Sequence, residues 1–96
     1  MPVMFSFHAA QRLEQRLNAR VDTRREVNIE SAFVKVKTYE HNAKPGVWAE
    51  AWVSRDTENP AVLIIDRRSR VVMTVLVGDA PFVSECYDLY RRRTMQ

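Results

Sequence analysis

The sequence predicts an α+β fold: a short N-terminal strand, two helices, a three-stranded antiparallel meander and a C-terminal helix, packed on a single sheet. Residues 61–66 and 71–77 are two runs rich in β-branched residues, and the short polar connection between them is typical of a hairpin. Residues 8–20 and the C-terminal segment instead repeat their apolar residues at helical spacing. We expect the helices to cover one face of the sheet.

The hairpin runs are almost continuously apolar, so we expect both strands to be central and covered on both faces. Residues 47–55 alternate instead, with Ala49 and Ala51 on one face and Trp48 and Trp52 on the other. The small residues leave room for a closely packed helix. The tryptophans have two interpretations, as base-stacking side chains or as ordinary core.

The N-terminal half contains two helix-start signals. Residues 3–7 are an edge strand or an apolar arm, and Ser6 is a candidate N-cap for a helix over residues 8–20. Thr23 and Glu26 have capping-box spacing, which predicts a second helix over residues 24–33. Residues 34–39 fit either a further helical turn or a strand. Asp79 is the predicted cap of the last helix.

Length and composition limit the class of protein. The 96 residues predict one domain, residues 1–96, and no apolar run reaches membrane-spanning length. The single cysteine, Cys86, cannot form an internal disulfide, which favours a cytoplasmic location, and a buried thiol is its default state. No metal-ligand spacing or glycine-rich phosphate loop is present, so we expect no cofactor and no metal.

The charge of the chain is carried mainly by arginine. Twelve of the 15 basic residues are arginines, and the formal net charge is +3. Arginine binds phosphate through a planar fork, which favours an anionic partner, although charged helix faces are commonly just solvated. The predicted nucleic-acid or partner-binding residues are Arg20, Arg67, Arg68, Arg70, Arg91 and Arg92.

The opening Phe-Ser-Phe-His-Ala-Ala-Gln-Arg-Leu-Glu-Gln-Arg, residues 5–16, resembles the F-S-x-H-A-x-x-R-h-x-x-R start (h apolar) of a family of small bacterial, phage and mobile-element proteins. That family is related to RelE-like toxins within the barnase, EndoU, colicin and RelE class of ribonuclease folds. Residues 71–75 are similar to its closing V-V-T-V strand, with Met73 inserted before the threonine. The resemblance implies a RelE-like fold with RNA or the ribosome as partner.

Carried over to this chain, the resemblance makes His8, Arg12 and Arg16 the motif positions. Metal-free RNA cleavage needs a proton-transfer group and cations around the phosphate, which are the roles we assign to them as candidate catalytic residues. Tyr87 joins them because RelE-like toxins often draw catalytic groups from this C-terminal region. The structural alternative is that His8 caps a backbone and the arginines pair with carboxylates such as Asp66 or Glu50.

Two functional hypotheses follow from these observations. The first is a RelE-like RNA-binding protein acting as a metal-free ribonuclease or toxin of a phage or mobile element. The second is a non-catalytic binding module that inhibits a host enzyme or nucleic-acid complex through its basic surface, by docking on an acidic host protein. Neither hypothesis involves a membrane, and both allow a monomer or a homodimer.

Overall fold

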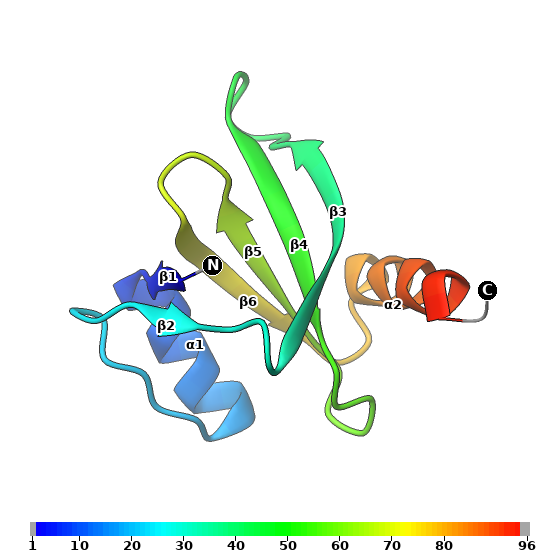
Figure 1. Ribbon diagram of the computed structural model, residues 1–96, viewed down its shortest axis with the longest axis horizontal. Helices are drawn as coiled ribbons and strands as arrows, with labels where there is room; N and C mark the ends of the chain where they lie inside the picture. Colours follow the sequence, from blue (N-terminus) through cyan, green and yellow to red (C-terminus); the bar gives the residue numbers. More distant parts are fainter. Residues whose placement is uncertain (1, 95–96) are drawn as a thin grey trace.

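Residues 2–94, which the computed structural model describes, form two helices and one six-stranded sheet (Figure 1). The helices are α1 (Phe7–Leu17) and α2 (Pro81–Thr94). The strands are β1 (Pro2–Phe5), β2 (Val27–Asn28), β3 (Phe33–Glu40), β4 (Trp48–Ser54), β5 (Ala61–Asp66) and β6 (Val71–Val77). The predicted α+β class is confirmed, and the sheet is curled and mixed.

The sheet order is β2-β1-β6-β5-β4-β3, so the last four strands form an antiparallel meander. The meander has one strand more than predicted because residues 34–39, which fitted two interpretations, belong to β3. β3 pairs with β4 from Phe33 to Glu40, with a register shift between Lys35 and Lys37. The hairpin prediction is confirmed, since β5 and β6 are antiparallel neighbours inside the sheet.

The N-terminal strand is neither an edge strand nor a free arm. β1 lies between β2 and β6 and runs parallel to β6. The Met4 amide donates to the Arg70 carbonyl at 3.1 Å, and the Ser6 amide donates to the Val72 carbonyl at 3.0 Å. Val3 and Phe5 are buried, so β1 completes both the backbone pairing of β6 and the core beneath it.

The predicted second helix over residues 24–33 is wrong. Asp22 accepts hydrogen bonds from the Arg24 amide through its side chain (2.9 Å) and from the Arg25 amide through its carbonyl (3.2 Å), which makes a turn. Val27 and Asn28 then pair with β1 as strand β2. The open edge of β1 and the burial of the following Ile29 override the local capping pattern, because strand pairing and a core position outweigh propensity.

Helix α1 has the predicted Ser6 cap, begins one residue before the predicted residue 8 and ends early. The Ser6 hydroxyl accepts from the Ala9 amide at 3.0 Å, which confirms the N-cap. The helix stops at Leu17 instead of residue 20 because Asn18 adopts the left-handed conformation, with φ +53°, and its amide donates back to the Glu14 carbonyl. Asparagine tolerates this conformation better than most residues, so it ends the helix.

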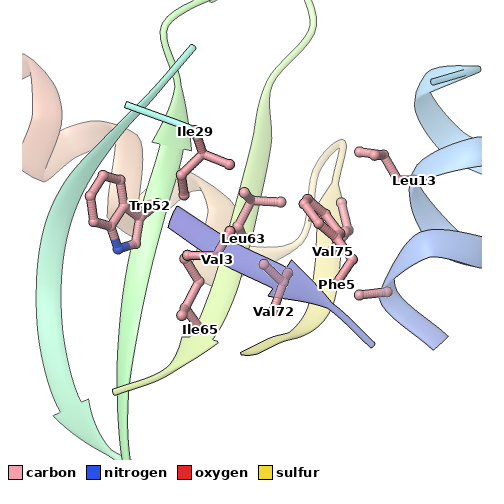
Figure 2. Packing of buried hydrophobic residues seen from close by; sticks show 10 residues of the cluster. Val3, Phe5, Leu13, Ile29, Trp52, Leu63, Ile65, Val72 and Val75 are labelled. Atoms are coloured by element: carbon pink, nitrogen blue, oxygen red, sulfur yellow. The ribbon is translucent and has the colours of Figure 1, made fainter. Parts of the chain in front are cut away.

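The two helices lie against opposite faces of the sheet, so the predicted one-sided arrangement is wrong. One buried cluster joins α1 to one face, and Figure 2 shows its side chains converging from β1, β4, β5, β6 and α1. Its buried members are Val3, Phe5, Ala9, Leu13, Ile29, Trp52, Leu63, Ile65, Val72 and Val75. The second cluster joins α2 to the other face: Ala49, Ala51, Val53, Val62, Ile64, Val83, Cys86 and Tyr87. β5 contributes apolar residues to both clusters, so each face needs its own cover.

Helix α2 packs on the small residues of β4, as the alternation in that strand predicted. Cys86 is fully buried in the same cluster as Ala49 and Ala51, and burial raises the pKa of its thiol to about 11. The first turn of α2 is closed by the Ala80 carbonyl, which accepts from the Val83 and Ser84 amides. The predicted cap was Asp79, but the residue that closes the first turn is Ala80, one position later.

Candidate nucleic-acid interface

The β5–β6 turn is built on the carboxylate of Asp66. Its Oδ1 accepts from the amides of Arg68 at 2.9 Å and Ser69 at 3.0 Å, while its carbonyl accepts from the Arg70 amide at 2.9 Å. The Ser69 amide, assisted by the Arg68 amide, outweighs the effect of burial and lowers the pKa of Asp66. Because the backbone uses this carboxylate, Arg67 and Arg68 are left exposed with no acidic partner among the described residues.

Arg70 behaves differently from the other two arginines of the turn. Its Nη1 lies 2.7 Å from Oε1 of Glu50, a β4 residue that is only 5% exposed. The same oxygen accepts from the Trp52 indole Nε1 at 3.0 Å, and Lys35 Nζ lies 3.8 Å from Oε2. Burial raises the pKa of Glu50, but the Arg70 and Trp52 hydrogen bonds and the charges of Arg70 and Lys35 outweigh it, so the net pKa is lowered.

The backbone of Arg70 is in the left-handed region, with φ +61°. Hairpin turns commonly place glycine at such a position, since a side chain there is strained. The arginine gains its contact with Glu50 in exchange, although its Nε is buried without a hydrogen-bond partner within residues 2–94. Glu50, Arg70, Lys35, Trp52, Arg67 and Glu30 together line a shallow cleft of about 370 Å³.

A larger cleft of about 680 Å³ lies next to it, between the β5–β6 turn and the start of β4; we call it the Trp48 cleft. The β3–β4 loop, which precedes Trp48, and the β5–β6 turn project from the same end of the sheet (Figure 1). The Arg67 amide donates to the Trp48 carbonyl at 2.9 Å, which ties the two walls together. The lining residues are Gly46, Val47, Trp48, Asp66, Arg67, Arg68 and Ser69.

The candidate catalytic residues of α1 form a separate region, which we call the α1 ridge: His8, Arg12 and Arg16. These three follow one another at four-residue spacing; His8 and Arg16 are exposed and Arg12 is half-buried, whereas Ala9 and Leu13 are buried. None of them forms a hydrogen bond or ion pair with another described side chain. Arg16 lines a shallow cleft with Asp56 without pairing to it.

Arg20 lies beyond the end of α1 and pairs with Glu14, with 3.3 Å between Nε and Oε1. Both side chains are more than half exposed, so this ion pair contributes little to stability. Arg20 is therefore accessible to a partner, although its charge is partly balanced.

Tyr87 is not brought to the α1 ridge. It is buried in the cluster on the α2 face, where its hydroxyl donates to the Ser54 carbonyl at 2.9 Å and accepts from the Ala61 amide at 3.2 Å. Burial raises the pKa of Tyr87. These bonds connect the two ends of the β4–β5 loop, which gives Tyr87 a structural role.

Arg91 and Arg92 lie on the exposed side of α2, on the opposite face of the sheet from α1. Arg91 pairs with Asp88. The predicted binding arginines therefore occupy three places: the β5–β6 turn, the α1 side and the C-terminal helix.

Two charged residues of the interface were not selected from the sequence. Glu50 was considered only as an ion-pair partner for helix arginines, and Lys35 fell in the segment that fitted both a helix and a strand. A signal for Glu50 does exist, since it is a charged residue between two tryptophans on one strand face. Its arginine partner could not be identified, because Arg70 is brought to it by the pairing of β4 with β5.

No family model, curated protein or solved structure matches this chain. Over residues 2–94, no three His, Cys, Asp or Glu side chains gather closely enough to hold a metal ion. Neither of the helices described here has the length and apolar character needed to cross a membrane.

Proposed function

We propose that this protein binds RNA through the α1 ridge and cleaves it without a metal ion, as a toxin-like ribonuclease of RelE-like architecture. The observation that carries the proposal is the unpaired state of Arg12 and Arg16, which have no carboxylate partner among the described residues. Unneutralised guanidinium groups bind the phosphates of a nucleic-acid backbone. The order of a strand, a helix, an antiparallel meander and a closing helix supports the RelE-like architecture.

The proposed reaction is transfer of the phosphoryl group within RNA. The ribose 2′-hydroxyl loses its proton to the neutral imidazole of His8 and attacks phosphorus, and the bond from phosphorus to the 5′-oxygen breaks. A water molecule then supplies a proton to the leaving 5′-oxygen, which produces a 2′,3′-cyclic phosphate and a free 5′-hydroxyl. Arg12 and Arg16 stabilise the negative charge that grows on the phosphoryl oxygens in the transition state.

The test is RNA turnover by purified protein in the presence of EDTA. His8→Ala and Arg12→Ala should each abolish cleavage of single-stranded or ribosome-associated RNA while the melting curve stays unchanged, since neither side chain forms a hydrogen bond or ion pair with another described side chain. Gln15→Ala, an exposed neutral change on the same helix, is the matched control and should cleave normally. Intact RNA with the wild-type protein under all these conditions would reject the enzymatic proposal.

A non-catalytic docking role is the second candidate, and the exposure of Phe7 favours it. This side chain is 80% exposed at the start of α1, beside the ridge, where a protein partner would bury it. Under this hypothesis a host protein of acidic surface binds in stoichiometric amount and no RNA is turned over. Phe7→Ser should release that partner, as should Arg67→Glu with Arg68→Glu if the turn contributes.

A further inference from the structure

The Trp48 cleft combines an exposed indole with two guanidinium groups that pair with no carboxylate of the described residues. Trp48 is 48% exposed, whereas Trp52, on the same face of the same strand, is 8% exposed. Phe7 and Trp48 are the large apolar side chains that residues 2–94 leave exposed. The indole of Trp48 is therefore available to a ligand, whereas that of Trp52 belongs to the core and holds Glu50.

The charges around the cleft favour an anion. Arg67 and Arg68 are exposed, and the nearby carboxylate of Asp66 is occupied by two backbone amides. Lys44 adds a positive charge close enough to lower the pKa of Asp66 slightly further, after the effects of the Ser69 and Arg68 amides. The opposing charges are Asp66, which lines the cleft and whose lowered pKa favours its charged form, and Glu40, which pairs with Trp48 across the β3–β4 ladder.

The walls of the cleft are fixed before any ligand arrives. The hydrogen bond from the Arg67 amide to the Trp48 carbonyl holds the turn against β4, and Asp66 fixes the turn from within. Arg70 pairs with Glu50 and does not line the cleft. Because Glu50 balances its charge, Arg70 adds little to the repulsion between Arg67 and Arg68 and does not compete with them for the ligand. A preformed site loses little conformational entropy on binding.

We propose that the Trp48 cleft binds one unpaired nucleotide, with its base stacked on the Trp48 indole and its phosphate held by Arg67 and Arg68. A planar base beside an anion matches an aromatic face beside a guanidinium fork. The cleft volume of about 680 Å³ lies in the range of small-molecule sites. A duplex hides the faces of its bases, so the site selects single strands. This inference rests on the proposed RNA-binding function and adds a second contact to it.

The experiment compares a short single-stranded oligoadenylate, a hairpin duplex and free AMP as probes, using tryptophan fluorescence and anisotropy. The oligoadenylate should quench the wild-type emission, and the quenching should disappear in Trp48→Phe, which retains Trp52. Trp48→Ala should weaken oligoadenylate binding at least about tenfold, and Trp48→Phe much less, because phenylalanine still stacks. The hairpin should bind without this dependence on residue 48. Quenching by AMP as well would show that the cleft also accepts a free nucleotide.

Charge variants test the phosphate contact. Arg67→Gln with Arg68→Gln should lower the dependence of log affinity on log salt by about 0.7, because the two arginines together hold one phosphate of a single strand. Arg25→Gln is the matched control, because Arg25 is exposed, pairs with Asp22 and lies outside the cleft. Glu40→Gln should tighten binding. Melting curves of all variants establish that they fold.

The outcomes separate this inference from the proposed function. If wild-type protein binds the oligoadenylate and Trp48→Ala binds it equally well, the cleft inference is wrong while binding through the α1 ridge stands. If probes quench Trp48 but Arg12→Ala and Arg16→Ala change nothing, the cleft stands and the α1 ridge proposal is wrong. Absence of binding by every probe would overturn both.

Discussion

The β5–β6 turn and the α1 ridge both contain arginines, but the arginines have different roles in the two regions. In the turn, Arg70 is held by Glu50, which is almost fully buried, whereas Arg12 and Arg16 on α1 have no acidic partner within residues 2–94. The difference comes from the neighbouring strand: β4 places a carboxylate beside the turn, and none of the described elements places one within ion-pair distance of the ridge. An arginine thus has a structural role where a neighbouring strand supplies a carboxylate, and it is available to a ligand where no carboxylate is near.

The turn also contains this contrast within itself. Arg67 and Arg68 are exposed, while Arg70, two residues further on, accepts a left-handed backbone and loses solvation at Nε. Its pairing with Glu50 offsets these costs. The comparison therefore predicts that removing Glu50 destabilises the fold, whereas removing a ridge arginine affects only the binding of a ligand.

Glu50→Ala should produce the largest effect. It leaves the Arg70 charge and the Trp52 indole N–H without their shared acceptor, and breaking a buried pair of this kind costs about 3 kcal/mol. Urea denaturation measures the loss in the free energy of unfolding. A double-mutant cycle with Arg70→Gln gives the coupling between the two side chains, and a coupling near zero would remove the distinction drawn between the turn and the ridge.

Tyr87→Phe should have the next largest effect. It removes the hydroxyl that accepts from the Ala61 amide and donates to the Ser54 carbonyl, so the free energy of unfolding should fall by about 1.5 kcal/mol. RNA binding and cleavage should not change, because Tyr87 lies on the α2 face. Loss of cleavage with an unchanged melting temperature would instead place Tyr87 in the catalytic site.

Acid should reduce the stability that the Glu50–Arg70 pair of the turn contributes to the fold. The pKa of Glu50 is below its ordinary value of 4.5, so its contribution is fully present above that pH and is lost as the pH falls through the pKa of the folded state. The free energy of unfolding should therefore drop more steeply on acidification in the wild type than in Glu50→Gln. Equal slopes for the two proteins would show that Glu50 is not stabilised in its charged form.

Arg12→Gln should have the smallest effect on folding, within about 0.5 kcal/mol, because the side chain forms no hydrogen bond or ion pair with a described residue. Its effect should appear in affinity for single-stranded RNA, with a lower salt dependence of binding. Denaturation and anisotropy titrations on the same preparation measure both. A destabilisation as large as that of Glu50→Ala would mean that the ridge is part of the folded framework.

Local sequence signals predicted the fold where they agreed with the tertiary environment. The hairpin, the Ser6 cap and the room beside the alanines of β4 are all confirmed. The capping-box spacing of Thr23 and Glu26 predicted a helix that does not form, because residues 27–28 pair with the open edge of β1 as a strand. Residues 34–39 fitted two structures locally, and pairing with β4 decided for the strand.

The candidate site shows the same division. The arginine-rich composition, the four-residue spacing of the α1 ridge and the two tryptophans were evident from the chain itself. Which tryptophan is exposed and which arginine is neutralised depended on the placement of β4 against β5 and of Ile29 over Trp52. Tyr87 was selected from its position near the C-terminus, but the packing of α2 turned it inward.

The sequence by itself determined strands β4, β5 and β6, the first helix cap and the excess of arginine, because periodicity, capping and charge are properties of neighbouring residues. Only the tertiary structure decided that the helices cover opposite faces, that β1 completes the sheet beside β6, and that Glu50 holds Arg70 while the α1 ridge finds no ion-pair partner within residues 2–94. These features join residues far apart in the chain, and their energies depend on burial and strand register, which arise only when the whole core assembles.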